Sequence, residues 1–132
     1  MRALVIDDSR AVRSILRGIL RDAGFEVAEA CNGREALACL DQGGVPELAL
    51  VDWNMPEMDG ISFVRAVRAQ ARFSALRLMM VTTENERVHV SGALDSGADE
   101  YVMKPFTREV ILEKLELLGL LQQGIPHACP GD

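Results

Sequence analysis

The sequence has few cysteines, no long apolar run and no recognisable signal peptide. Cys31, Cys39 and Cys129 are odd in number and lack the spacing of a metal site, so we expect reduced thiols in a cytosolic protein. No apolar run approaches the ~18 residues that cross a bilayer, and the N-terminus lacks an apolar signal segment with a cleavage site. We therefore expect a cytoplasmic protein without membrane insertion.

Positive charge is also scarce. The chain has 14 Lys and Arg against 20 Asp and Glu, which gives a formal net charge of -6. An acidic domain has little attraction for the phosphate backbone, so direct nucleic-acid binding is not expected. With 48% hydrophobic and 26% charged residues, the 132 positions suit one folded domain and neither a disordered chain nor two domains.

Apolar residues recur in patterns that predict strands alternating with helices. Short apolar runs predict strands at about 2–7, 26–30, 47–51, 76–82 and 99–103. Helical spacing predicts helices at about 10–23, 34–42, 61–71, 86–96 and 107–121. Residues 1–121 then form one domain, and the Gly- and Pro-containing segment 122–132 is predicted to be a flexible C-terminal tail.

The first predicted helix, 10–23, has a pronounced pattern of its own. Ser9 suits the N-cap position and Gly24 suits a stop. Its buried face is expected to consist of Val12, Ile15, Leu16, Ile19 and Leu20.

The alternation of strands and helices indicates an α/β fold with a parallel sheet covered by helices on both faces. Five strands and five helices fit a doubly wound, flavodoxin-like sheet of order 2-1-3-4-5. In that order strands 2–7 and 47–51 are neighbours at the point where the winding reverses. Ligands of such sheets bind beyond the carboxyl ends of the strands.

Polar side chains follow four of the predicted strands at those ends. Asp7-Asp8, Asp52, Thr82-Thr83 and Lys104 come directly after apolar runs, so we expect them to meet at one edge. Each has a structural explanation when taken alone, such as a turn, a cap or a solvated lysine. Their shared position at the carboxyl ends of parallel strands favours a functional site.

The chemistry of this set suits a divalent cation and a phosphoryl group. Clustered carboxylates repel each other unless a cation compensates, and Mg²⁺ prefers carboxylates, carbonyls and water as ligands. Lys104 adds a second positive charge, which leaves room for phosphoryl oxygens. A carboxylate can itself act as the nucleophile and form an acyl phosphate.

Four segments give the chain a resemblance to the receiver domain of response regulators, most of all to the single-domain chemotaxis regulators. The segments are Asp7-Asp8, the stretch 52–60 (DWNMPEMDG), the stretch 81–84 (VTTE) and the stretch 104–107 (KPFT). The intervals also fit, with 44 residues from Asp8 to Asp52, 30 to Thr82 and 22 to Lys104. The resemblance covers about residues 2–120.

The resemblance implies a role for each residue of the expected site. Asp52 would accept a phosphoryl group from a histidine kinase. Asp8, Asp52 and the Asn54 carbonyl would bind Mg²⁺, with Asp7 acting through a water molecule. Lys104, expected before a cis peptide to Pro105, and Thr82 would contact the phosphoryl group.

Further residues are assigned by the same resemblance to switching and tuning. Tyr101 would rotate inward after phosphorylation, although its spacing alone favours packing at the edge of the core over a switch. Asn54 and Glu84 would tune loss of the phosphoryl group. Thr83 stands where the family prefers Ala or Gly, and either narrows access to Asp52 or packs against helix 86–96.

The favoured interpretation is a phosphorylation switch that is not an enzyme and whose output is protein binding. The face made by helix 86–96, strand 99–103 and helix 107–121 would bind the downstream protein. Within this class, the chain is either a chemotaxis regulator, a receiver cut from a longer regulator, or a phosphate sink or adaptor. The alternative class is a Mg²⁺-dependent phosphohydrolase, in which Asn54 stands where an acid/base Asp is usual.

Overall fold

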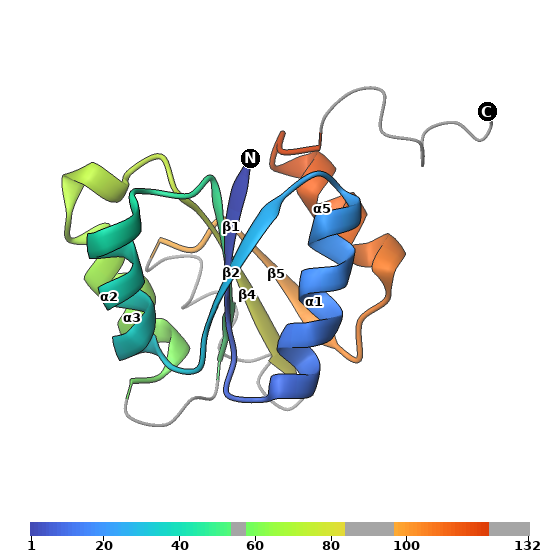
Figure 1. Cartoon of the computed structure of the whole chain (residues 1–132), viewed down its shortest axis with the longest axis horizontal. Coiled ribbons are helices and arrows are strands. Elements are labelled where there is room, and N and C mark those ends of the chain that lie inside the picture. Colours follow the sequence, from blue (N-terminus) through green and yellow to red (C-terminus); the bar gives the residue numbers. More distant parts are fainter. Residues whose placement is uncertain (54–57, 84–96, 122–132) are drawn as a thin grey trace.

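A computed structural model of the chain describes residues 1–53, 58–83 and 97–121. Its centre is a sheet of five parallel strands in the order β2-β1-β3-β4-β5, as predicted (Figure 1). The strands are β1 (Arg2–Ile6), β2 (Glu26–Ala30), β3 (Leu48–Asp52), β4 (Arg77–Thr83) and β5 (Glu100–Lys104). Each lies within about two residues of its predicted bounds.

Helices cover both faces of the sheet. They are α1 (Arg10–Asp22), α2 (Gly33–Gly43), α3 (Gly60–Arg68) and α5 (Arg108–Leu117), with a short 3-10 helix at Ala71–Phe73. Figure 1 shows α2 and α3 on one side of the sheet and α1 and α5 on the other. The helix expected at 86–96 and the tail expected at 122–132 lie outside the described residues.

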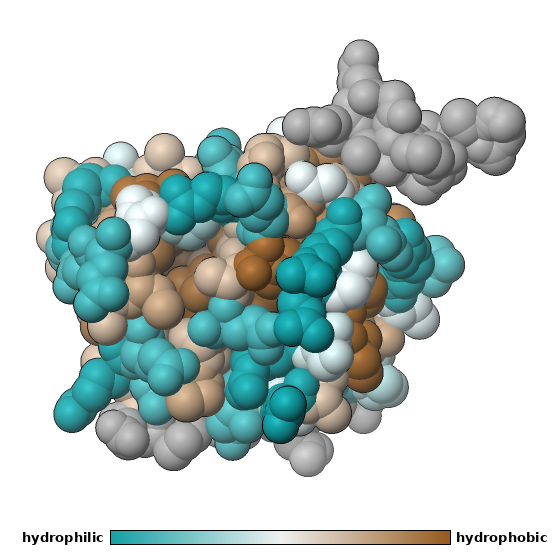
Figure 2. All heavy atoms as spheres, viewed as in Figure 1, coloured by the Kyte–Doolittle hydropathy of each residue, from teal (hydrophilic) through white to brown (hydrophobic). Residues whose placement is uncertain are grey.

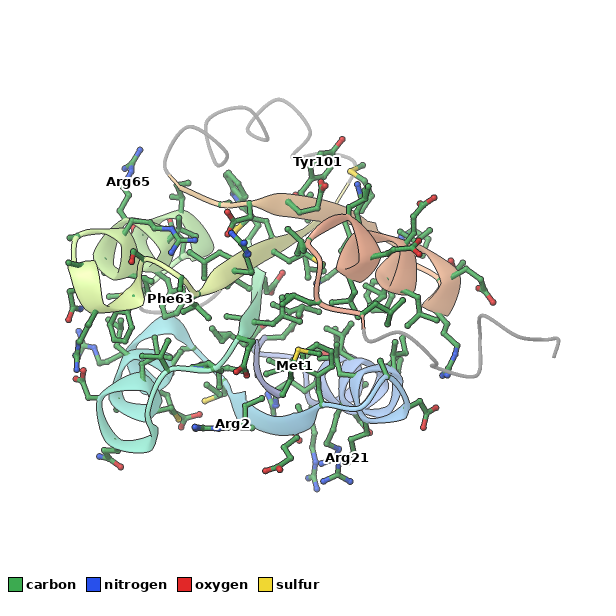
Figure 3. The ribbon with its side chains drawn as sticks, turned by 90° about the horizontal axis from the view of Figure 1, so that it is seen from above. Met1, Arg2, Arg21, Phe63, Arg65 and Tyr101 are labelled. Atoms are coloured by element: carbon green, nitrogen blue, oxygen red, sulfur yellow. The ribbon has the colours of Figure 1, made fainter. Side chains whose placement is uncertain are left out.

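The sheet separates two apolar cores because successive strand residues point to opposite faces. In β1, Leu4 and Ile6 pack on the α2–α3 side, whereas Ala3 and Val5 pack on the α1–α5 side. All five residues of β3 are buried, as expected for a central parallel strand. On α3, Phe63 points into the core and Arg65 points outward (Figure 3).

Helix α1 begins and ends where the sequence predicts, but its apolar face is narrower than predicted. The Ser9 hydroxyl accepts a hydrogen bond from the Val12 N–H at 3.3 Å, and Gly24 has a positive φ of 99°. Ile15, expected to be buried, is 55% exposed. It lies about a quarter turn from the centre of the buried stripe formed by Leu16 and its neighbours, beyond the arc that the sheet covers.

Two helices are shorter than predicted. Helix α3 ends at Arg68, before the 3-10 helix, and α5 ends at Leu117, with Gly119 at a φ of 75° just beyond it. Within the described ranges, no helix is long and apolar enough to cross a membrane. On the face shown in Figure 2, hydrophilic residues cover much of the surface, and hydrophobic atoms are visible between them.

Candidate functional site

The carboxyl ends of β1, β3 and β5 bring acidic and basic side chains together, as predicted. Asp7 follows β1, Asp52 ends β3 and Lys104 ends β5. Carboxylate oxygens of Asp7, Asp8 and Asp52 all lie within 4.8 Å of one another. Asp7 and Asp52 are buried, whereas Asp8 is exposed, so the cluster opens to solvent on the Asp8 side.

Lys104 reaches across the end of β4 to two of these carboxylates. Its Nζ lies 3.1 Å from Asp52 Oδ1 and 3.4 Å from Asp7 Oδ2. The peptide bond between Lys104 and Pro105 is cis, as the resemblance implies. The ammonium therefore occupies the inner side of the cluster and compensates part of its negative charge.

Asp7 is held by hydrogen bonds on its main chain and its side chain. Its N–H donates to the Ala30 carbonyl of β2 at 3.1 Å, and its Oδ1 accepts from the Ser9 N–H at 2.8 Å. Its carbonyl oxygen accepts from Arg13 Nη1 at 2.7 Å. From the sequence, Ser9 is predicted only as the N-cap and Arg13 is not identified, because a contact to a main-chain carbonyl leaves no motif.

The surroundings of Asp52 oppose its ionisation. Burial and the neighbouring charge of Asp7 raise the pKa of Asp52 from 3.8 to about 6, and Lys104 offsets part of this increase. Burial would lower the pKa of Lys104, but the carboxylates of Asp52 and Asp7 outweigh it and raise the pKa above its ordinary value. The single ammonium thus leaves the carboxylates undercompensated, which favours binding of a further cation.

Gly60, the first residue of α3, allows the main chain to approach the end of β3 closely. Its N–H donates to the Trp53 carbonyl at 2.9 Å. A Cβ atom at this position would lie 2.5 Å from the Asp52 carbonyl oxygen and 2.8 Å from Met80 Cε. In the sequence, Gly60 is recognisable only as the last residue of the stretch 52–60, because this close approach depends on the packing of α3 on the sheet.

The remaining predicted residues are placed as follows. Thr82 is buried near the end of β4, one position beyond Val81, which pairs with Asp52. Tyr101 lies on β5 and is labelled in Figure 3; its ring contacts the ammonium of Lys114 of α5, 5.1 Å from the ring centroid. Asn54 and Glu84 lie outside the described residues, and only the main chain of Thr83 is described.

The three carboxylates could hold a metal ion. Carboxylate oxygen is the donor type that Mg²⁺ and Ca²⁺ prefer, and the exposure of Asp8 leaves room for the water ligands that Mg²⁺ retains. Among the residues that the structure describes, Asp7, Asp8 and Asp52 are the one cluster of His, Cys, Asp or Glu side chains that could bind a cation. The donor set therefore fits a hard divalent ion.

Comparison with known proteins agrees with this geometry. Residues 3–116 match the response regulator receiver domain. The chain belongs to this receiver family. The receiver domain is 42% identical over 119 residues to the chemotaxis protein CheY1 of Helicobacter pylori. The aligned region covers 89% of this chain and 96% of the relative. It is 44% identical over 117 residues to the chemotaxis protein CheY of Pseudomonas aeruginosa, covering 88% of this chain and 94% of the relative.

Solved structures confirm the fold of the receiver domain. The chemotaxis response regulator CheY4 of Vibrio cholerae superposes with a TM-score of 0.81 and 37% sequence identity. The alignment covers 89% of this chain and 97% of that structure. The resemblance found from the four sequence segments is thus confirmed at the level of family and fold.

Proposed function

We propose that Asp52 is the phosphoacceptor of this receiver domain and that a histidine kinase is the donor. The observation that carries the proposal is the buried Asp52 carboxylate, which lies 3.1 Å from Lys104 and beside two further aspartates at the open edge of the sheet. In the transfer, an Asp52 oxygen forms a bond to phosphorus as the phosphorus–nitrogen bond of phosphohistidine breaks. The ring nitrogen keeps the electron pair and takes up a proton.

Mg²⁺ is the proposed cofactor. Asp8 and Asp52 would hold it together with the Asn54 carbonyl, and Asp7 would act through a water molecule. When bound, Mg²⁺ supplies positive charge that offsets the repulsion between the carboxylates and the phosphoryl oxygens. The exposed position of Asp8 and the fixed position of Asp7 support this division of roles.

Lys104 and Thr82 are proposed to bind the phosphoryl group. The ammonium already lies beside the Asp52 oxygen, and it would exchange that contact for a phosphoryl oxygen once the carboxylate is modified. Thr82 would donate its hydroxyl from the neighbouring strand. Tyr101 would then turn inward from its contact with Lys114 and change the surface of β5.

The output is proposed to be protein binding at the face of residues 86–96, β5 and α5. Phosphorylation would shift the population between two states of this face, and a downstream protein would bind one of them. The similarity to CheY proteins over nearly their whole length supports a role in chemotaxis, in the cytoplasm, with residues 1–121 as the functional unit.

Residues beside the acceptor are proposed to tune the lifetime of the phosphoryl group. Asn54 and Glu84 have this role by resemblance to the family. If Thr83 narrows access to Asp52, Thr83→Ala should speed phosphorylation by a small donor, measured by stopped-flow fluorescence of Trp53. Equal rates for the variant and the parent would assign Thr83 to packing.

The assignment of the acceptor can be tested with acetyl phosphate and Mg²⁺. Asp52→Asn should abolish phosphorylation detected by mass spectrometry, because the amide is not a nucleophile. Asp41→Asn is the matched control, since Asp41 is an exposed carboxylate paired with Arg72 on the outside of α2. Phosphate that persists on the Asp52 variant, or is lost from the Asp41 variant, would contradict the proposal.

A further inference from the structure

Arg13 contacts the acidic cluster through the main chain. It lies on α1, one turn after the Ser9 cap, and its side chain is 16% exposed. Its Nη1 donates to the Asp7 carbonyl oxygen at 2.7 Å, while its Nε donates to Glu29 Oε1 at 3.0 Å. These two bonds of Arg13 use no carboxylate oxygen of the cluster.

Glu29 orients this guanidinium from β2. Its second oxygen accepts from Arg17 Nη1 at 2.7 Å, so one carboxylate is shared by two arginines on successive turns of α1. The next residue, Ala30, accepts the Asp7 N–H. A guanidinium has donors in a rigid planar fork, so fixing Nε on Glu29 also fixes the direction of Nη1.

The Asp7 carbonyl and the Asp8 N–H belong to one planar peptide unit. The bond from Arg13 therefore sets the plane from which Asp8 leaves the main chain. We propose that Arg13 is a positioning residue that holds the Asp7–Asp8 peptide so that the exposed Asp8 carboxylate faces Asp52. This inference rests on the proposed cation site, and it adds a residue that acts on the site without binding the ion.

The sign of the effect separates positioning from charge. The positive charge of Arg13 repels a divalent cation bound at the acidic cluster. By Coulomb interaction alone, removing that charge should therefore tighten binding of the cation. Losing the orientation of Asp8 should weaken it, and loss of a residue that orients metal ligands typically costs about tenfold in affinity or more. The two explanations thus predict opposite changes for the same variant.

Titration of the full-length protein with Mg²⁺, followed by Trp53 fluorescence, tests the proposal. Arg13→Ala should weaken Mg²⁺ binding about tenfold. Arg17→Ala removes the same charge from the same face and also loses a bond to Glu29, but it leaves the Asp7 carbonyl bonded, so its affinity should change less than about twofold. Where Arg13→Ala does not fold, Arg13→Gln takes its place.

A measurement without metal provides a second readout. In metal-free protein, the Asp8 amide resonance should shift in Arg13→Ala and stay in place in Arg17→Ala, because Arg13 is bonded to that peptide and Arg17 is bonded to Glu29 instead. Unchanged or tighter Mg²⁺ binding in Arg13→Ala, or equal loss in both variants, would overturn the proposal. Asp8→Ala tests the cation site separately: a normal Mg²⁺ response in that variant would refute the site itself, whatever Arg13 does.

Discussion

Asp52 lies between a lysine that favours its charge and surroundings that oppose it. Burial and Asp7 prevail over Lys104 and leave the pKa of Asp52 at about 6. The folded protein therefore binds a proton at Asp52 more readily than the unfolded chain does. Tighter proton binding at Asp52 stabilises the folded state. This stabilisation is fully present below pH 3.8 and is lost as the pH rises through about 6.

We expect this loss to be visible in metal-free protein. Asp52→Asn places a neutral amide where the carboxylate stood, so the variant should become more stable than the parent as the pH rises from 4 to 7. Thermal unfolding followed by circular dichroism in EDTA measures the difference. Asp41→Asn, which removes an exposed carboxylate of α2, is the control for the loss of one negative charge. A stability difference between Asp52→Asn and the parent that stays constant from pH 4 to 7 would contradict the raised pKa of Asp52.

Most of the residues that carry charge at the site can be predicted from the sequence, because each follows an apolar strand. The contacts that hold these residues in place are harder to predict from the sequence. Arg13 is recognisable as a helix residue, but its bond to the Asp7 carbonyl depends on how α1 lies beside β2. The exposure of Ile15 was also predicted wrongly, since helical spacing gives a direction of burial without the width of the surface that covers it.

At the level of elements, the site depends on how closely the start of α3 approaches the end of β3. Asp59 caps the helix by accepting the Ser62 N–H at 2.9 Å, and Gly60 lies against the Asp52 carbonyl. This contact links the orientation of α3 to the residue that we propose as the phosphoacceptor. A side chain at position 60 would have to move either the helix or the end of the strand.

Two glycine substitutions test this link. Gly60→Ala should destabilise the protein by about 1–3 kcal/mol, the usual cost of overpacking a tight core position, and should weaken the Trp53 response to Mg²⁺. Gly18→Ala is the matched control: apart from the backbone of α1 itself, no atom of the described residues lies within 4 Å of the added Cβ, so this substitution should stabilise the protein by about 0.5–1 kcal/mol. Urea unfolding measures both. Equal effects of the two substitutions would exclude the close contact at Gly60.

For the whole molecule, the order of the strands was predictable because alternating strands and helices permit few arrangements. Right-handed crossovers and burial of β3 on both faces leave the order 2-1-3-4-5 as a favoured solution. The ends of α3 and α5 were predicted less well, since helical spacing continued past the residues where the chain turns. Turn geometry is local and depends on positive φ angles such as that of Gly119.

Binding of a cation at one edge of this domain should stabilise the entire fold, because only the folded chain brings the three aspartates together. At a Mg²⁺ concentration 100 times the dissociation constant, the gain is about 2.7 kcal/mol. For a domain of this size, that gain should raise the unfolding midpoint by roughly 10 °C. The shift should shrink at pH 5, where a proton competes for Asp52, whose pKa is about 6.

Because the net charge is -6, added salt can also stabilise the fold by screening repulsion between negative charges. This screening has to be separated from specific binding of Mg²⁺. Any cation screens the repulsion within an acidic domain, so Mg²⁺ must be compared with Na⁺ at equal ionic strength. Screening should act equally on the parent and on Asp8→Ala, whereas specific binding should raise the midpoint of the parent alone. An equal rise of the unfolding midpoint in both proteins would show that Mg²⁺ acts by screening the net charge. It would remove the evidence for a cation bound at Asp8.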